Sequence, residues 1–567
     1  MAEMFRYLTT IIENEEKKGW KLLVVFTLLS PVMEVFSFSV MIFIVNTIVQ
    51  EKQVSIQMIA FTFSMGAISL LKGLFDIYKC KLSTHFLYSG SQKLSMKLFE
   101  LHIKEELECH NRKSAVQVLT AVREDTERCM DVMITCIEAC SGIFVMTGYF
   151  VLMIYVKKWI GLFSSILLVL FMMCMFYRYR RQMKAYGEER RLYVTRANAQ
   201  VTIAYGMFKE MKIDDKADTI LRRYQDASRG YARVQEKYRY KNSIIRMAMQ
   251  NLVMAVAFVV FASFLWCLKE NMIFTIASMA VYIGVLVKAI PTAYEIVKGM
   301  NYIEFSRRPY EIVRECLTKY AKMQEREKAS ENIREKRLTF QKGLSVRNLS
   351  FQYNEHTQIF CDASIEIPAG YSVAIIGVSG IGKTTFLDLI LGLLEPQAGS
   401  IRYDDYDIVT HTDDKGICKA RVGDIVSYIP QTIYLNGETI RNNVAFFEEE
   451  RIDDDKVIEC LKCAQVWKDV TQLPEGIHTL IGENGAAISG GQRQRIALAK
   501  ALYRDFELLI MDEATAALDM ETEKAVIDSI RQVKRNKTIL IVTHHMSLAD
   551  ECDIVYRIEN QKLIRVK

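Results

Sequence analysis

The stretch GVSGIGKTT, at positions 377–385, combines glycines with a lysine and two threonines directly after the apolar run YSVAII. Gly377, Gly382, Lys383 and Thr384 match the pattern GxxxxGK[ST], in which backbone N–H groups turn inward around phosphate oxygens. In that pattern the lysine reaches the terminal phosphates and the following hydroxyl binds Mg2+. These residues predict a nucleoside triphosphate site, and they favour it strongly over a glycine turn that only caps a helix.

Polar groups at the ends of three other apolar runs could complete a hydrolytic site. Asp512 ends LLIMD and would join the Mg2+ shell, while Glu513 beside it would activate water against the γ-phosphate. His544 ends ILIVTH, and Gln431 follows VSYIP. Ligands of an open α/β sheet bind beyond the carboxyl ends of its strands, so we expect these groups to meet at one edge. For His544 taken alone, a surface histidine without a role would be the ordinary interpretation.

A second glycine-rich stretch, ENGAAISGGQRQR, covers positions 483–495 and leads into a helical pattern. Ser489, Gly490 and Gly491, with Gln492 beside them, have the composition of a helix N-terminus that can receive an anion. One chain would therefore hold two phosphate-binding elements, and the first of them already has its own lysine.

The residues before about position 300 have the pattern of a membrane protein. Six apolar stretches are long enough to span a bilayer, which takes about 20 residues each. They cover positions 21–49, 55–78, 133–156, 159–177, 247–267 and 272–297. Short links join these stretches in pairs, and long segments at 79–132 and 178–246 separate the pairs. Arg and Lys are abundant in the second long segment, which favours a cytosolic position for the long segments and for both termini.

The long segments also have helical patterns. We therefore expect the membrane helices to continue into the cytosol and to hold the turns NRKSAVQVL and AYGMFKEMK away from the bilayer. Glu34 stands out because it lies well inside the first apolar stretch, where a carboxyl group is costly. It would either face a substrate path or form a polar lock between helices, and the second alternative is the more economical.

Composition argues against several other classes of protein. A net charge of +6 is small for 567 residues and fits the basic loops of a membrane protein, so no nucleic-acid partner is predicted. The 13 cysteines form no disulfide or zinc pattern, since the pair Cys460 and Cys463 has no second pair to complete a tetrahedral site. The N-terminal stretch lacks the cleavage site of a secretory signal.

The phosphate loop, Gln431, ISGGQ, MDE and TH occur in the order found in ATP-binding cassette (ABC) transporters. Six spans before one cassette resemble a half-size ABC exporter, and the resemblance covers essentially the whole chain. It implies that Tyr353 stacks on adenine and that Asp519 belongs to a loop at the interface of two cassettes. It also implies that Glu483 contacts the cytosolic turns and that Gln431 touches Mg2+. The remaining residues that match the phosphate loop are Ser379, Gly380 and Thr385.

In this family ATP lies between two cassettes, with the phosphate loop of one facing the signature helix of the other. The resemblance therefore implies that Ser489, Gly490, Gly491 and Gln492 meet the γ-phosphate held by Lys383 of a second chain, while His544 contacts the γ-phosphate in its own chain. ATP and Mg2+ are the expected cofactors. No site residue is missing, so a homodimer is the economical expectation, and a heterodimer with a similar half-transporter is the alternative.

The predicted fold class is a multi-domain membrane protein. A six-span all-α exporter-type membrane domain covers residues 1–310, a charged linker covers 311–337, and an α/β P-loop ATP-binding cassette covers 338–567. We expect a bacterial multi-pass protein of the cell membrane with both termini in the cytoplasm. Its expected function is ATP-driven export or flipping of an amphipathic substrate, such as a lipid, a peptide or a drug-like molecule.

Two alternatives remain for the function. The membrane half is most similar to bacterial lipid-linked oligosaccharide flippases, but the link QEKQV is shorter than the external segment of those proteins. No peptidase domain precedes the first span, which disfavours a leader-cleaving peptide exporter. The second alternative is a membrane ATPase that does not transport and acts as a sensor or immunity partner.

Overall fold

The structure is a computed structural model of all 567 residues. It describes residues 16–51, 56–156, 158–266, 272–331, 335–354, 357–413, 416–418, 420–446, 448, 451–482, 485–513, 525, 528 and 537–567. The chain divides into two compact units, and each is described by itself. The first contains Met1–Glu105 and Cys109–Gln324, and the second contains Glu106–Glu108 and Glu325–Lys567.

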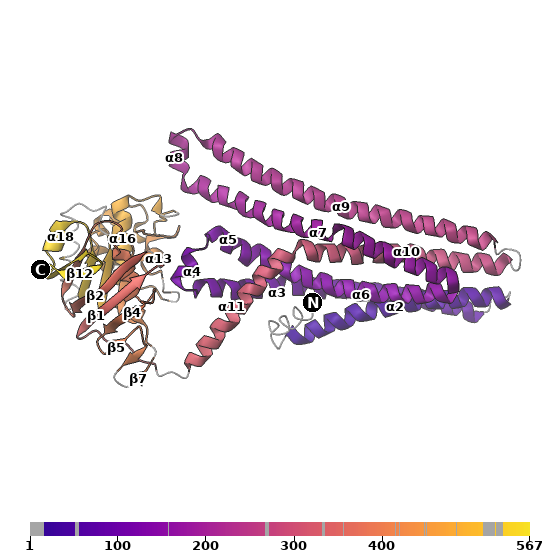
Figure 1. The fold of residues 1–567 in the computed structure, drawn as a ribbon, viewed down its shortest axis with the longest axis horizontal. Helices are drawn as coiled ribbons and strands as arrows, with labels where there is room; N and C mark the ends of the chain where they lie inside the picture. Colours follow the sequence, from indigo (N-terminus) through magenta and orange to yellow (C-terminus); the bar gives the residue numbers. More distant parts are fainter. Residues whose placement is uncertain are drawn as a thin grey trace. The chain divides into compact units, whose positions relative to one another are not determined.

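The first unit is built of helices that run alongside one another (Figure 1). Its elements are α2 (Glu16–Glu51), α3 (Ile56–Ile103), α4 (Leu107–Asn111), α5 (Ala115–Thr120), a π-helical turn (Ala121–Asp125), α6 (Thr126–Val156), α7 (Lys158–Gly206), α8 (Phe208–Ile213), α9 (Ala217–Trp266), α10 (Met272–Phe305) and α11 (Arg307–Glu331). The predicted long helices are α3, α7 and α9, each of which continues well past its apolar stretch. The short helices α4, α5 and α8 form the two predicted turns.

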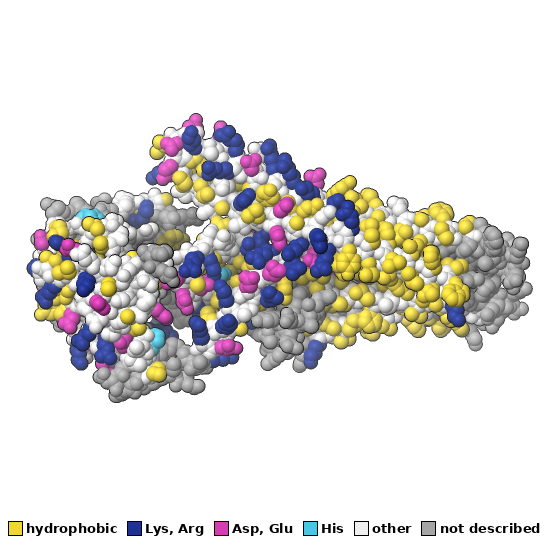
Figure 2. Space-filling model, viewed as in Figure 1, with side chains coloured by type: hydrophobic (Ala, Val, Ile, Leu, Met, Phe, Trp, Pro, Cys, Tyr) yellow, Lys and Arg dark blue, Asp and Glu magenta, His cyan; other side chains and the backbone are white. Residues whose placement is uncertain are grey.

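Five helical segments in the described residues are long and apolar enough to cross a membrane: Gly19–Ile44, Ile59–Ile103, Ala115–Val156, Lys158–Gly206 and Ala217–Val259. The sixth predicted stretch lies in α10, where the side chains at the start of the helix are outside the described part. Figure 2 shows hydrophobic side chains covering a broad stretch of this unit, with Lys and Arg side chains gathered beside them. An apolar belt bordered by basic groups is the pattern of a membrane protein.

The interior of the helical unit is a packed seam along α6 and α10. Tyr149, Tyr282, Val285 and Ala289 are fully buried there. Large apolar side chains of α3 point outward instead, for example Phe63 with 79% of its surface exposed. Several large apolar side chains exposed together on one long helix fit contact with lipid or with another membrane helix.

The second unit is an α/β domain with two sheets. Its strands are β1 (Gly343–Gln352), β2 (Gln358–Pro368), β3 (Ser372–Ile376), β4 (Ala398–Tyr403), β5 (Tyr406–Asp407), β6 (Thr412–Asp413), β7 (Gly416–Ile417), β8 (Val426–Ile429), β9 (Leu508–Asp512), β10 (Thr538–Val542), β11 (Ile554–Glu559) and β12 (Lys562–Arg565). Its helices are α12 (Lys383–Ile390), α13 (Ile440–Val444), α14 (Asp454–Cys463), α15 (Trp467–Thr471), α16 (Gly490–Tyr503) and α18 (Met546–Asp550).

One sheet has the order β2-β1-β4-β5-β6-β7 and the other the order β12-β11-β3-β10-β9-β8. In the second sheet β11, β3, β10, β9 and β8 are parallel neighbours. Strands β3, β9 and β10 are buried at every position, as their continuous apolar runs predict.

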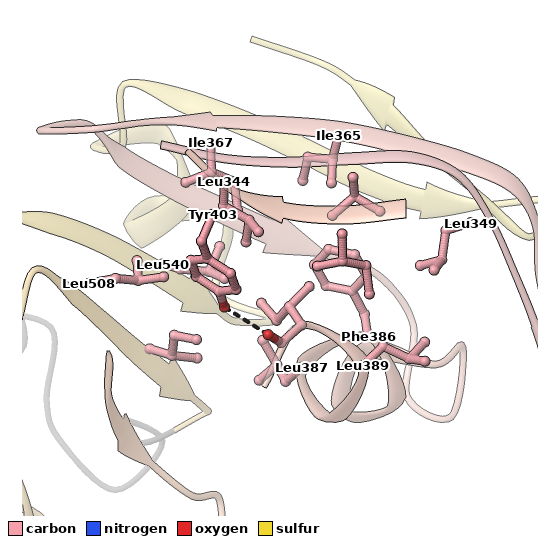
Figure 3. Packing of buried hydrophobic residues seen from close by; sticks show 14 of the residues in the cluster. Leu344, Leu349, Ile365, Ile367, Phe386, Leu387, Leu389, Tyr403, Leu508 and Leu540 are labelled. Carbon is pink, nitrogen blue, oxygen red and sulfur yellow. Dashed lines mark hydrogen bonds between the residues drawn. The ribbon is translucent and has the colours of Figure 1, made fainter. Parts of the chain in front are cut away.

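The two sheets enclose one core, in which α12 is packed between them (Figure 3). Tyr403 is fully buried there, and its hydroxyl donates a hydrogen bond to the carbonyl oxygen of Ile390, 2.7 Å away. This bond satisfies a polar group that would be costly to bury alone. It also fixes the end of α12, the helix that follows the phosphate loop.

Candidate active site

The polar residues predicted to act together lie at one edge of the parallel sheet. Strands β10 and β9 are in register up to the pair Val542–Asp512, and β3 and β8 flank them. The segments that follow these strands therefore leave the sheet on the same side. This register brings Asp512, Glu513, Gln431 and His544 to the loop that follows β3.

That loop turns into α12 through Gly382, whose φ of 109° is in the left-handed region. A Cβ atom at this position would lie 2.5 Å from Cγ2 of Ile359, so glycine is required for both conformation and space. The turn places Lys383, only 7% exposed, with its ammonium inside the loop. Nζ of Lys383 donates to the carbonyl oxygens of Gly377 at 2.9 Å and Val378 at 3.3 Å.

Thr384 and Asp512 form the metal side of the site. Oγ1 of Thr384 donates to Oδ2 of Asp512 at 3.2 Å, and Asp512 is only 2% exposed. Mg2+ prefers oxygen ligands, and a hydroxyl and a carboxylate oxygen lie close together here. These two residues therefore fit the predicted metal, with the phosphates of the nucleotide as its other ligands.

Glu513 is the point on which the other functional side chains converge. Its Oε2 accepts a hydrogen bond from Nε2 of Gln431 at 2.7 Å, and its Oε1 lies 3.3 Å from Nζ of Lys383. Nδ1 of His544 lies 3.8 Å from the same Oε1. The backbone of Glu513 has a φ of 48°, which is uncommon for a residue with a side chain, and its N–H donates to the carbonyl oxygen of Val542.

Two further residues touch this site, and the sequence-based interpretation missed both. The hydroxyl of Tyr428 donates to Oδ2 of Asp512 at 3.5 Å. Asp388 lies one helical turn after Thr384 on α12. Burial together with the charge of Asp512 raises the pKa of Asp388 to about 6. The spacing of four residues between Thr384 and Asp388 was the available signal, because it puts both side chains on one helix face.

Burial also raises the pKa of Asp512, with the charge of Glu513 acting in the same direction. Hydrogen bonds from Thr384 and Tyr428 and the charge of Lys383 work against this shift. Burial thus disfavours the anionic forms of Asp388 and Asp512. A divalent cation would relieve that cost.

At the predicted adenine side, Tyr353 is 47% exposed, and its hydroxyl lies 3.2 Å from Oγ1 of Thr385. Its ring packs edge-on against Phe351, with centroids 5.0 Å apart. One ring face is thus available beside the phosphate loop, as stacking requires. Ser379 and Gly380 lie in the exposed bend of the loop between β3 and α12.

The second glycine-rich stretch forms the predicted helix start. Ser489 caps α16: its Oγ accepts from the N–H of Gln492, and Oε1 of Gln492 accepts from the N–H of Ser489. This capping box satisfies two backbone donors, and it leaves Ser489 and Gly490 exposed. Ser489 and Gln492 thus bond each other, whereas Lys383 bonds within its own loop. Glu483 and Asp519 lie outside the described residues.

Residues 360–516 match the ABC transporter family. The whole chain superposes on a solved structure described as a bacterial Atm1-family ABC exporter with ATP bound, with a TM-score of 0.76. The superposition covers 97% of this chain and 95% of the other, at 19% sequence identity. The chain has the fold of an ABC exporter. The predicted fold class, a helical membrane domain followed by an α/β ATP-binding cassette, is confirmed.

Curated relatives match over part of the chain. The ATP-dependent lipid A-core flippase of Haemophilus influenzae (strain 86-028NP) is 34% identical over 221 residues, which are 39% of this chain and 37% of the relative. The protein of the same name from Escherichia coli (strain K12) is 33% identical over 222 residues, again 39% of this chain and 37% of the relative. The match thus spans little more than a third of these relatives.

Proposed function

We propose that the chain is one half of a dimeric exporter that uses ATP to move an amphipathic substrate across the cytoplasmic membrane. One observation carries the proposal: Lys383, Thr384, Asp512 and Glu513 are assembled at one edge of the cassette sheet, in a chain that also has the apolar helices of a membrane protein. The matches to the ABC transporter family and to lipid A-core flippases support it.

The geometry suggests how the site would work. Lys383 would exchange its bonds to the loop carbonyls and to Glu513 for the terminal phosphates of ATP. Thr384, Asp512 and Gln431 would hold Mg2+, which supplies charge neutralisation at the phosphates when bound. Once Lys383 leaves it, Glu513 has an oxygen available to accept a proton from the attacking water. His544 would donate a hydrogen bond to the γ-phosphate.

The working unit is proposed to be a homodimer, or a heterodimer with a similar half-transporter. The exposed start of α16 at Ser489 is a second phosphate-binding element, and Lys383 has its own loop. A second chain would let each element meet the nucleotide held by the other. Mixed variants of the two elements, described below, test this arrangement.

We propose a bacterial multi-pass membrane location with both termini in the cytoplasm. The basic side chains beside the apolar belt support this orientation, because positive segments remain on the cytosolic side (Figure 2). A second candidate function is the flipping of a lipid-linked oligosaccharide; the curated relatives are named flippases, although of lipid A-core. A membrane ATPase that senses without transporting is the third possibility.

Reconstitution of the full chain in liposomes tests the proposal. Candidate substrates should stimulate ATP hydrolysis and should accumulate on one side only when ATP is present. The variant Glu513→Gln should abolish both effects. Glu507→Gln is the matched control, because it also replaces a glutamate that pairs with a lysine. Oε1 of Glu507 lies 2.7 Å from Nζ of Lys537 in the same domain, and both side chains are partly exposed. Hydrolysis that no candidate stimulates, without accumulation of any of them, would favour the sensor.

A further inference from the structure

A cavity of about 560 Å³ lies among α2, α3, α6, α9 and α10 of the helical unit. Its wall includes Pro31 of α2 and Pro291 of α10, which both lie inside their helices. Proline removes a helical hydrogen bond and clashes with the preceding turn, so helices bend where it occurs. The two prolines therefore give a local reason for the space between α2 and α10. We call this space the acidic chamber.

The wall of the acidic chamber carries more negative than positive groups. Five carboxylates and two ammonium groups line it among the described residues. The carboxylates are Glu34, Asp76, Asp131, Glu138 and Glu295, and the ammonium groups belong to Lys79 and Lys298. All seven lie on α2, α3, α6 or α10.

Two of these carboxylates have cationic partners within the protein. Oε2 of Glu34 lies 2.8 Å from Nζ of Lys72, and its Oε1 accepts from the hydroxyl of Tyr149 at 2.7 Å. These contacts join α2 to α3 and α6, as the polar-lock interpretation of Glu34 predicts, while Glu34 also lines the chamber. Glu295 lies 3.0 Å from Nζ of Lys298. These two pairs contribute little net charge to the chamber.

The other three carboxylates leave an excess of negative charge. Asp76 accepts a hydrogen bond from the neutral hydroxyl of Ser30 at 2.8 Å. Among the described residues, no ion pair within 4.0 Å involves Asp76, Asp131 or Glu138. Lys79 is the cation that lines the chamber with them. Apart from the internal pairs, three carboxylates and one ammonium group therefore line the chamber, and Asp131 also borders a neighbouring cavity that Arg128 lines.

The rest of the wall can hold an apolar body. Val145 and Ile296 line the chamber, and so do the rings of Tyr238 and Tyr302. Aromatic faces attract organic cations as well as apolar groups. A neighbouring cavity of about 660 Å³ also touches Asp131 and Tyr302, but Arg128 and Arg190 line it, so the acidic excess is much smaller there.

We infer that the acidic chamber takes an amphipathic organic cation. The inference rests on the proposed export function and assigns a charge to its substrate. The uncompensated carboxylates would attract the cationic group, and the aromatic and aliphatic wall would receive the apolar part. A lipid-linked oligosaccharide, whose phosphate linker is anionic, would meet repulsion in the same chamber. The charge of the wall thus favours a cationic cargo over the flippase alternative.

Two ions of the same shape and opposite charge test this inference. The full chain in lipid nanodiscs is dialysed against tetraphenylphosphonium or tetraphenylborate without ATP, and binding to nanodiscs without protein is subtracted. Saturable binding of the cation should be at least about tenfold tighter than that of the anion. High salt should reduce this preference, because it screens charges. Equal binding of the two ions, or tighter binding of the anion, would overturn the inference.

Two kinds of variant, one expected to weaken binding and one to strengthen it, distinguish a change of charge in the chamber from a folding defect. Asp76→Asn combined with Glu138→Gln should weaken binding of tetraphenylphosphonium about tenfold, because two uncompensated charges disappear. Lys79→Gln should instead strengthen it about threefold, an effect that a damaged fold would not produce. Asp226→Asn combined with Glu236→Gln removes the same two charges from exposed positions on α9, and this control should stay close to the parent chain.

If the chamber variants and the control behave alike, the chamber does not select charge and the inference is wrong. The binding measurement needs no ATP, so this failure would leave the proposed exporter function untouched. Conversely, a chain that binds the cation but shows no substrate-stimulated hydrolysis would contradict the exporter function and keep the binding site.

Discussion

Replacing Glu513 by glutamine should have two separable effects, because this carboxylate is proposed to act as the catalytic base and also pairs with Lys383. As the base placed to accept a proton from water, it should contribute a factor of about 10² to 10⁴ to hydrolysis. As the partner of Lys383, it also competes with the phosphates of ATP. The pair is well buried, with 7% of the lysine side chain and 16% of the glutamate side chain exposed.

The size of the second effect follows from the distance of 3.3 Å between Nζ of Lys383 and Oε1 of Glu513. At an effective dielectric constant of about 20, the gross attraction is about 5 kcal/mol. Much of that is offset by desolvation and by the loop carbonyls that also accept from Lys383, which leaves about 1–2 kcal/mol net. Glu513→Gln should therefore bind ATP roughly 5 to 30 times more tightly.

Both effects can be measured on the full chain in nanodiscs. Fluorescent ATP titrations without Mg2+ give the affinity, and phosphate release with Mg2+ gives the turnover. Glu507→Gln should change neither value, since Glu507 pairs with Lys537 away from the site. Near-normal turnover in Glu513→Gln would refute the role of Glu513 as base. An unchanged affinity for ATP would refute the competition for Lys383.

Three further predictions concern the assembly, the metal and the pH. Dimers that combine a Ser489→Arg chain with a Lys383→Ala chain should keep one intact site and trap one ATP with vanadate. Dimers of either variant alone should trap none. If the mixed dimer also traps no ATP, the shared site is contradicted. Tyr428→Phe should raise the Mg2+ concentration for half-maximal hydrolysis about fivefold, roughly the worth of one hydrogen bond. ATP affinity without Mg2+ should not change, and an unaltered Mg2+ requirement would show that Tyr428 does not position Asp512. The pKa of Asp388, raised to about 6 by burial and by Asp512, is above that of an unfolded aspartate near 4. The nucleotide-free domain should therefore lose stability as the pH rises through this interval, and Asp388→Asn should remove that loss, on the order of 1 kcal/mol after solvent screening. Urea unfolding at pH 4.5 and pH 7.5 in EDTA measures it, and the same pH slope in both proteins would contradict the assignment.

Glu513 is the shared partner of three polar side chains. Lys383, Gln431 and His544 all lie within 4 Å of its carboxylate. Binding of ATP would attract Lys383 away and release one oxygen. The same residues would then act on the nucleotide, and the change needs only short side-chain movements.

Local patterns of sequence were enough to locate most of the predicted chemistry. The phosphate loop, the strand ends at Asp512 and His544, and the helix start at Ser489 are encoded in short runs, because each depends on backbone geometry that nearby residues impose. The long apolar helices are equally local, since their length and hydropathy follow from the thickness of a bilayer. The assignment of residues to roles in catalysis stays a prediction.

Other features depend on segments that are far apart in the chain, and only the tertiary structure decided them. Tyr428 contacts Asp512 because β8 and β9 are neighbours, and the ion pair of Glu513 with Lys383 depends on the order of β3, β10 and β9. The contacts of Glu34 with Lys72 and Tyr149 depend on the positions of other helices, and so does its place in the wall of the chamber. The acidic chamber also depends on residues that are far apart in the chain. No single helix contains its charge excess, which arises because helix packing brings together carboxylates that the sequence spreads over the whole membrane half.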